Sequence, residues 1–111
     1  MGQFVRGDVV VLNFPFSDLS QTKRRPALVL ASLAGDDVIL CQITSQARFD
    51  AYSIVLESAD FVDGNLNQSS RIRPNRLFTA DEAIILYRAG RVATAKMDEV
   101  ATGLADILNL R

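Results

Sequence analysis

Residues 23–30 read Lys-Arg-Arg-Pro-Ala-Leu-Val-Leu, so three cations stand directly before an apolar segment that is typical of a core strand. Pro26 has no backbone N–H, and its ring pushes the preceding residue toward an extended conformation. We therefore expect Arg25 to be presented from the rigid entrance of a strand. Cations held in this way are typical of an anion-binding feature.

Short runs rich in β-branched residues on both sides of this segment predict a strand-rich body. We expect strands at residues 8–14, 27–31, 38–44, 53–57 and 70–75, with a hairpin turn at 34–37 and a polar stretch at 63–69. Closely spaced short strands separated by turn signals indicate a mainly β fold, specifically a small antiparallel barrel. Residues 81–93 fit either a strand or a helical turn, and both alternatives stay open.

The last part of the chain follows a helical period. Its apolar residues recur at i, i+3, i+4, i+7, i+10 and i+11, namely at Met97, Val100, Ala101, Leu104, Ile107 and Leu108. We expect one C-terminal α-helix whose apolar stripe packs on the barrel. Thr94 is the expected N-cap, and Asp98 with Glu99 suits the positive end of the helix dipole.

Length and composition indicate one compact domain, residues 1–111. Hydrophobic residues make up 49% of the chain, which favours a real core over disorder. The apolar runs are too short to span a bilayer, and no signal-peptide pattern opens the sequence. We therefore expect a cytoplasmic protein.

Two residue types limit the chemistry. The chain has no histidine, which removes Ser-His and Cys-His nucleophilic systems, the commonest general base and zinc sites that need imidazole. Cys41 stands alone within a strand-like run and is expected to be a small buried hydrophobe, not a reactive thiol. Any chemistry must use other groups.

The net charge of −1 by itself predicts no affinity for nucleic acid. The cations are nevertheless clustered, because seven of the twelve fall in three short segments: Lys23, Arg24, Arg25, Arg48, Arg71, Arg73 and Arg76. If the segments converge in space, they form a basic groove that suits a nucleic-acid backbone. If they do not, they are three separate solvated faces, and both interpretations stay open.

Several motifs, in their order and spacing, resemble MazF/PemK-type toxins of bacterial toxin–antitoxin systems. They are Gly-Asp at 7–8, Phe-Pro-Phe-Ser-Asp-Leu at 14–19, Arg-Pro at 25–26, Ile-Thr-Ser at 43–45 and Ile-Arg-Pro at 72–74. The C-terminal helix also falls where that family has one. The resemblance covers nearly the whole chain.

The resemblance implies a compact SH3-like barrel that forms a homodimer and cleaves single-stranded RNA at short sequences. The implied activity is that of a metal-independent endoribonuclease without a cofactor. In that family the ribose 2′-hydroxyl attacks the adjacent phosphorus, leaving a cyclic phosphate and a free 5′-hydroxyl. A cognate antitoxin is the implied partner, and its acidic or apolar disordered tail blocks the substrate groove.

The resemblance also implies the site residues. The catalytic arginine and threonine of the family match Arg25 and Thr44. The residues expected to bind RNA are Lys23, Arg24, Ser45, Gln46, Arg48, Arg73 and Asn75. A loop over the groove is expected at Phe16, Ser17 and Asp18. Some relatives carry an acidic residue at the position of Asn75 and some use a histidine, so the motif assigns no conventional base here.

These residue types suit the implied chemistry on physical grounds. The substrate supplies its own 2′-hydroxyl nucleophile, so catalysis reduces to orienting the phosphate and stabilising its added negative charge. The planar fork of donors on Arg25 matches a phosphate, and the hydroxyl of Thr44 can donate a further hydrogen bond.

Two other functions stay open at this stage. One is a binding toxin of the same barrel superfamily, like the gyrase-poisoning CcdB toxins, which grip a protein without cutting RNA. The other is an RNA-binding or regulatory relative that has lost catalysis. Cleavage of RNA in EDTA distinguishes the ribonuclease from both.

Overall fold

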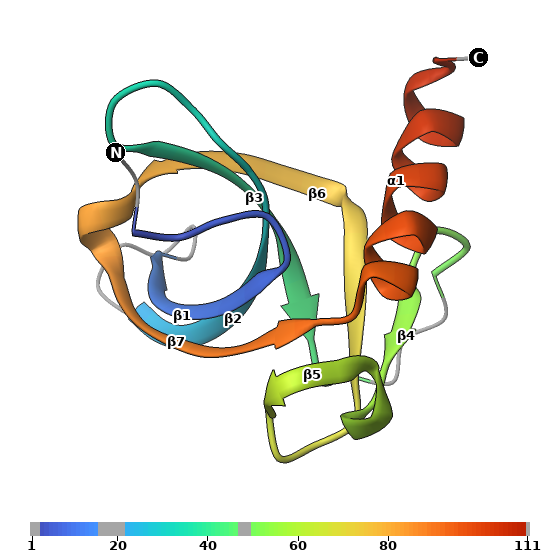
Figure 1. Cartoon of the computed structure of the whole chain (residues 1–111), viewed down its shortest axis with the longest axis horizontal. Coiled ribbons are helices and arrows are strands. Elements are labelled where there is room, and N and C mark those ends of the chain that lie inside the picture. The colour runs from blue at the N-terminus through green and yellow to red at the C-terminus, as the bar shows by residue number, and fades with distance from the viewer. Residues whose placement is uncertain (1–2, 16–21, 47–49, 111) are drawn as a thin grey trace.

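A computed structural model describes residues 3–15, 22–46 and 50–110. Within them, seven strands form one antiparallel sheet in the order β4-β6-β3-β2-β1-β7-β5. The elements are β1 (Asp8–Pro15), β2 (Thr22–Ser32), β3 (Asp37–Thr44), β4 (Ile54–Leu56), η1 (Ser58–Asp60), β5 (Phe61–Gly64), β6 (Ser70–Asp81), η2 (Glu82–Ile84), β7 (Ile85–Val92) and α1 (Thr94–Leu108). Figure 1 shows the sheet curling into a half-barrel with α1 beside it. The predicted mainly β fold with a C-terminal helix is confirmed.

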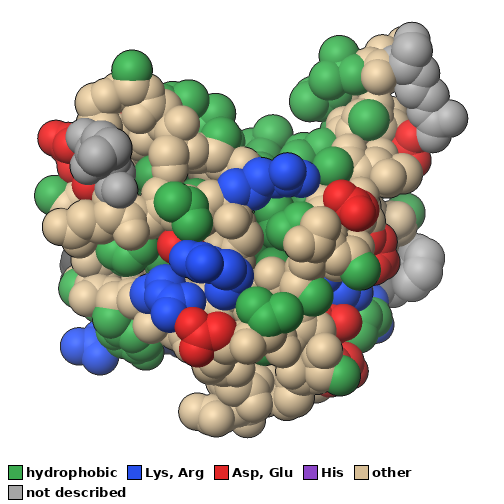
Figure 2. Space-filling view, in the orientation of Figure 1, with side chains coloured by type: hydrophobic (Ala, Val, Ile, Leu, Met, Phe, Trp, Pro, Cys, Tyr) green, Lys and Arg blue, Asp and Glu red, His purple; other side chains and the backbone are tan. Residues whose placement is uncertain are grey.

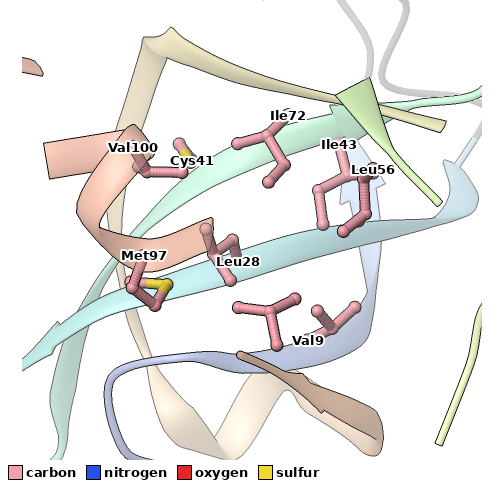
Figure 3. Packing of buried hydrophobic residues seen from close by; sticks show 9 residues of the cluster. Val9, Leu28, Cys41, Ile43, Leu56, Ile72, Met97 and Val100 are labelled. Carbon is pink, nitrogen blue, oxygen red and sulfur yellow. The ribbon is translucent and has the colours of Figure 1, made fainter. Parts of the chain in front are cut away.

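Both faces of the central strands are buried. One cluster, shown in Figure 3, joins Val9, Leu28 and Cys41 of the sheet to Met97 and Val100 of α1. A second cluster, on the other side of the sheet, fills the curl of the barrel with side chains that include Val10, Leu12, Ala27, Val29, Val38, Leu40 and Ile85. This double burial explains why β1, β2 and β3 read as nearly continuous apolar runs.

Cys41 lies fully buried in the first cluster, so the expectation of a small buried hydrophobe is confirmed. Burial raises the pKa of its thiol to about 12. The reactive thiolate is therefore scarce at neutral pH.

The strand that carries the three cations begins earlier than expected. β2 starts at Thr22 and pairs with β1 from there, whereas its pairing with β3 starts only at Ala27, opposite Gln42. The expectation of a strand entrance at residue 27 is therefore wrong. Pro26 lies inside β2 but outside the β2–β3 ladder, a position that tolerates a missing N–H.

The predicted end of the fifth strand near Pro74 is also wrong, because β6 continues to Asp81. Along β3, Cys41 pairs with Leu77 and the next residue, Gln42, pairs with Arg73. The three residues between these partners, 74–76, form a bulge. A bulge bends its strand, so the two halves of β6 pair with different parts of β3.

The remaining elements follow the sequence in part. The ambiguous residues 81–93 become η2 and strand β7. The expected turn at 34–37 is present, and Gly35 adopts φ +80 there. Strand β5 was missed because it is a short, largely exposed edge strand whose pairing partner, β7, is distant in sequence.

The C-terminal helix is confirmed, but its expected cap is not. Ala93 is the N-cap residue, with no side-chain cap hydrogen bond, and Thr94 is already helical. The backbone N–H of Ala93 donates to Asp60 O at 2.8 Å, which ties the helix start to η1. Asp98 and Glu99 lie beyond the first turn, where the helix dipole has little effect. Among the described residues, no helix is long and apolar enough to cross a membrane.

Candidate active site

The candidate catalytic pair lies where β2 and β3 part. Ala27 and Gln42 form the last cross-strand pair at this end of the two strands. Arg25 stands two residues before Ala27, and Thr44 stands two residues after Gln42. Because side chains alternate along a strand, both lie on the face of the Ala27–Gln42 pair. The fork between the strands therefore has Arg25 on one side and Thr44 on the other.

The neighbouring strand β6 adds two arginines to the face that carries Arg25 and Thr44. Thr44 pairs with Arg71, and Gln42 pairs with Arg73. Arg71 and Arg73 alternate with the buried Ile72, so both arginines lie on the same face as Thr44. Arg71 was expected among the clustered cations but not in the site. The alternation in Ser-Arg-Ile-Arg-Pro was the signal that could have placed it there.

The hydroxyl of Thr44 is held in place by the backbone that follows it. Its Oγ1 accepts a hydrogen bond from the backbone N–H of Gln46 at 3.1 Å. This contact occupies one acceptor position and leaves the hydroxyl hydrogen to be donated to a ligand. Thr44 is half-buried, so its side chain loses little conformational freedom when it binds a ligand.

Arg73 has a carboxylate partner that the sequence did not predict. Its Nη2 and Nε lie 3.0 and 3.3 Å from Oδ2 of Asp50. The backbone N–H of Tyr52, followed by the Arg73 guanidinium, lowers the pKa of Asp50 against the opposing effect of its desolvation. Because the folded pKa is depressed, Asp50 stabilises the fold above its ordinary pKa. That contribution is lost as the pH falls through the lowered value.

We expect Asp50→Asn to strengthen RNA binding, because it removes a negative charge and releases the guanidinium of Arg73 for a phosphate. Titration of an oligonucleotide with blocked 2′-hydroxyls across salt concentrations checks this, and the salt dependence becomes steeper by about one counterion. Asp36→Asn, in the turn at the other end of β3, is the matched control and leaves binding unchanged. Equal or weaker binding by Asp50→Asn contradicts the expectation.

A cavity of about 230 Å³ opens at the fork, and Arg24, Arg25 and Ser45 are among the residues that line it. The third basic segment reaches the same end of β3 through the pairing of Arg71 with Thr44, but none of its cations lines this cavity. Lys23 is exposed on β2, opposite Phe14, and Gln46 is exposed just after β3. The other expected residues lie elsewhere: Asn75 is exposed in the β6 bulge, and Arg48, Phe16, Ser17 and Asp18 are outside the described residues.

Two further arginines belong to a structural network. Arg91 Nε lies 2.9 Å from Oδ1 of the buried Asp8, and Arg88 contacts both Asp8 and Asp63. Figure 2 shows the face of the molecule on which basic and acidic side chains stand side by side. Arg88 and Arg91 thus hold β7 to β1 and β5.

The curled sheet with its C-terminal helix is the fold of solved MazF structures. A chain of the MazE–MazF complex from Deinococcus radiodurans matches with a TM-score of 0.78 and 22% identity over 97% of each chain. MazF from the same organism matches at 0.75 and 24% over 96% of each chain. An endoribonuclease from a mycobacterial species, in complex with its cognate antitoxin, matches at 0.77 and 18% over 97% of each chain. No curated protein sequence matches significantly.

The family itself follows from the sequence model of PemK-like, MazF-like toxins of type II toxin–antitoxin systems, which matches residues 5–108. The chain belongs to this family. The resemblance carried by the Arg-Pro, Ile-Thr-Ser and Ile-Arg-Pro motifs is thereby confirmed.

Proposed function

We propose that this protein is a metal-independent endoribonuclease that cleaves single-stranded RNA, including mRNA, at short sequences. The observation that supports this most is the fork between β2 and β3, where Arg25 and Thr44 share one face of the sheet. Arg71 pairs with Thr44 and lies on the same face. A guanidinium and a hydroxyl facing one gap can bind the same phosphate.

In the proposed reaction the 2′-hydroxyl oxygen forms a bond to the adjacent phosphorus, and the bond from phosphorus to the 5′-oxygen breaks. The 2′-hydroxyl loses a proton and the 5′-oxygen gains one, so the products are a cyclic phosphate and a 5′-hydroxyl. Arg25 donates to the non-bridging oxygens, where negative charge grows, and Thr44 donates a second hydrogen bond. Arg71 adds positive charge beside them.

The remaining predicted residues have supporting roles in this proposal. Lys23, Arg24 and Arg73 bind flanking phosphates, and Ser45, Gln46, Arg48 and Asn75 contact the RNA nearby. The segment with Phe16, Ser17 and Asp18 covers the groove. We also propose a cytoplasmic homodimer.

A cognate antitoxin with an acidic tail completes the proposal, since that tail would meet the cations of the groove. We expect its binding to weaken as salt rises and to weaken again in Arg24→Ala, because screening and charge removal act on the same attraction. A calorimetric titration series across salt concentrations measures both effects. An affinity indifferent to salt and to this substitution contradicts the expectation.

The proposed activity is tested by incubating the purified protein with a long single-stranded RNA in EDTA. We expect fragments with cyclic or 3′-phosphate ends and free 5′-hydroxyls. Thr44→Ala slows cleavage on the order of 100-fold, the effect of removing one preorganised donor, whereas Thr44→Ser keeps the hydroxyl and most of the rate.

Thr79→Ala is the matched control, because Thr79 is exposed and pairs with Ile39 toward the other end of β3. This variant should cleave like the unaltered protein. Intact RNA at high protein concentration, with no antitoxin present, would sink the proposal and leave the binding-toxin or inactive RNA-binding alternatives.

A further inference from the structure

Tyr87 is half exposed at the back of the fork. It pairs with Val11 of β1, and Val11 pairs with Pro26 of β2, so the three side chains form one row across three strands. Val11 is buried, whereas the tyrosine is 50% exposed. Tyr87, Val11 and Pro26 all line the 230 Å³ cavity of the fork. The cavity therefore has an apolar surface with an accessible aromatic ring beside it.

A fixed loop forms another wall of this cavity. Residues 65–69 follow β5 and run beside β7, where the backbone N–H of Asn65 donates to Ala89 O at 3.3 Å. The side-chain oxygen of Asn65 accepts from the N–H of Leu66 at 2.7 Å. The buried hydroxyl of Ser70 donates to Gln68 O at 3.1 Å. These contacts hold Leu66 and Gln68 against the cavity before any ligand arrives.

The cavity combines the groups that bind an unpaired base. It offers an aromatic ring for stacking, the amide of Gln68 and hydroxyl of Ser45 for a base edge, and Arg24 and Arg25 for phosphate. Its volume lies below the ~300–1,000 Å³ usual for drug-sized ligands, so it suits one planar ring system. By the same strand alternation, Val11 and Pro26 lie on the face opposite to Arg25, so the cavity opens behind the fork. Arg25 also lines this cavity and therefore connects it to the phosphate that we propose to bind at the fork.

We propose that this cavity binds the nucleobase next to the scissile phosphate, with the base stacked on Tyr87 and its edge hydrogen-bonded by Gln68. The inference rests on the proposed ribonuclease function and extends it to the source of sequence preference. Tyr87 and Gln68 are then specificity-determining residues, while Arg25 and Thr44 act on the phosphate.

The other tyrosine offers a matched comparison. Tyr52 is 54% exposed, and it lines a different cavity, against α1, together with Glu99 and Asp106. Two carboxylates repel a phosphate backbone, so this cavity is unsuited to RNA. The two tyrosines thus have similar exposure in opposite electrostatic surroundings.

Tyrosine fluorescence tests the proposal directly, because the chain has two tyrosines and no tryptophan. In Tyr52→Phe the emission comes from Tyr87 alone, and in Tyr87→Phe it comes from Tyr52 alone. The probes are short 2′-O-methyl homopolymers of adenine, cytosine and uracil, in which the attacking hydroxyl is blocked. We expect a saturating loss of emission in Tyr52→Phe with at least one probe, and none in Tyr87→Phe.

Kinetics gives a second readout. Tyr87→Ala should raise KM roughly tenfold with little change in kcat, since stacking on one base is lost, and Tyr87→Phe should restore KM. Gln68→Ala should reduce the difference in affinity among the three homopolymers. A Tyr87→Ala variant that lowers kcat at unchanged KM overturns the inference.

Fluorescence anisotropy of labelled probes separates this inference from the function on which it rests. If the probes bind but the emission of Tyr87 stays unchanged, the base site is refuted and the ribonuclease proposal survives. If the probes do not bind and RNA is not cleaved, both are refuted.

Discussion

Arg25→Ala is expected to slow RNA cleavage by about 10³-fold, the usual cost of removing a charged donor from a developing phosphate charge. The guanidinium supplies two parallel hydrogen bonds as well as its charge, whereas an ammonium supplies a point charge only. Arg25→Lys should therefore recover only part of the rate. Cleavage of a labelled oligonucleotide, followed in EDTA, measures all three proteins.

Arg6→Ala is the control for this substitution. Arg6 is exposed and precedes β1 near the opposite end of the sheet, so its loss should leave cleavage unchanged. Arg25 is half-buried within β2, so each variant is also melted to verify its fold. A folded Arg25→Ala protein that cleaves at nearly the original rate would remove Arg25 from the proposed mechanism.

Gly64→Ala is expected to be the more damaging of two glycine substitutions. Gly64 has φ +71, and a Cβ built on it would lie 2.1 Å from the carbonyl oxygen of Ala89. Gly64 pairs with Gly90, and a Cβ on Gly90 would lie 2.4 Å from Asp63 O, so this crossing of β5 and β7 has no room for a side chain. Backbone strain of ~1–3 kcal/mol and overpacking of ~1–3 kcal/mol both reduce the free energy of unfolding.

Gly35→Ala separates these two effects. Gly35 has a similar φ, +80, but nothing lies within 4 Å of the place that a Cβ would occupy, so only the strain remains. Urea denaturation should therefore show Gly64→Ala to be less stable than Gly35→Ala by about 1–3 kcal/mol. Equal losses in the two variants would mean that β5 moves away from β7 at no cost.

The crossing of β5 and β7 also affects the site. Residues 65–69 leave β5 directly after Gly64 and carry Leu66 and Gln68 to the cavity. A displaced β5 therefore moves one wall of the proposed base site. We expect Gly64→Ala to weaken binding of the RNA probes as well as the fold, whereas Gly35→Ala affects stability alone.

Two prolines fix the backbone that carries Arg25 and Arg73. Arg25 precedes Pro26 and Arg73 precedes Pro74, and a proline keeps the preceding backbone extended. Pro26 lies just outside the β2–β3 ladder, and Pro74 begins the bulge of β6. β2 therefore parts from β3 where the site opens, whereas β6 resumes regular pairing with β3 beyond its bulge and carries Arg73 and Arg71 to the same end.

Local patterns in the sequence predicted much of this protein. The 3.6-residue period from Met97 to Leu108 predicted the helix, because that apolar stripe depends only on neighbours along the chain. The β-branched runs predicted most strands for the same reason. The motifs around Arg25 and Thr44 identified the family, since they carry residue types in a particular order and spacing.

The tertiary structure decided the features that depend on distant pairing. The edge strand β5, the continuation of β6 beyond Pro74 and the ion pair of Arg73 with Asp50 each join residues far apart in the chain, and no local period encodes such a contact. The same holds for Tyr87, which reaches the candidate site only because β7 pairs with β1. The sequence by itself thus determined the fold class, the family and the candidate residues Arg25 and Thr44, whereas pairing between distant strands decided which side chains surround them.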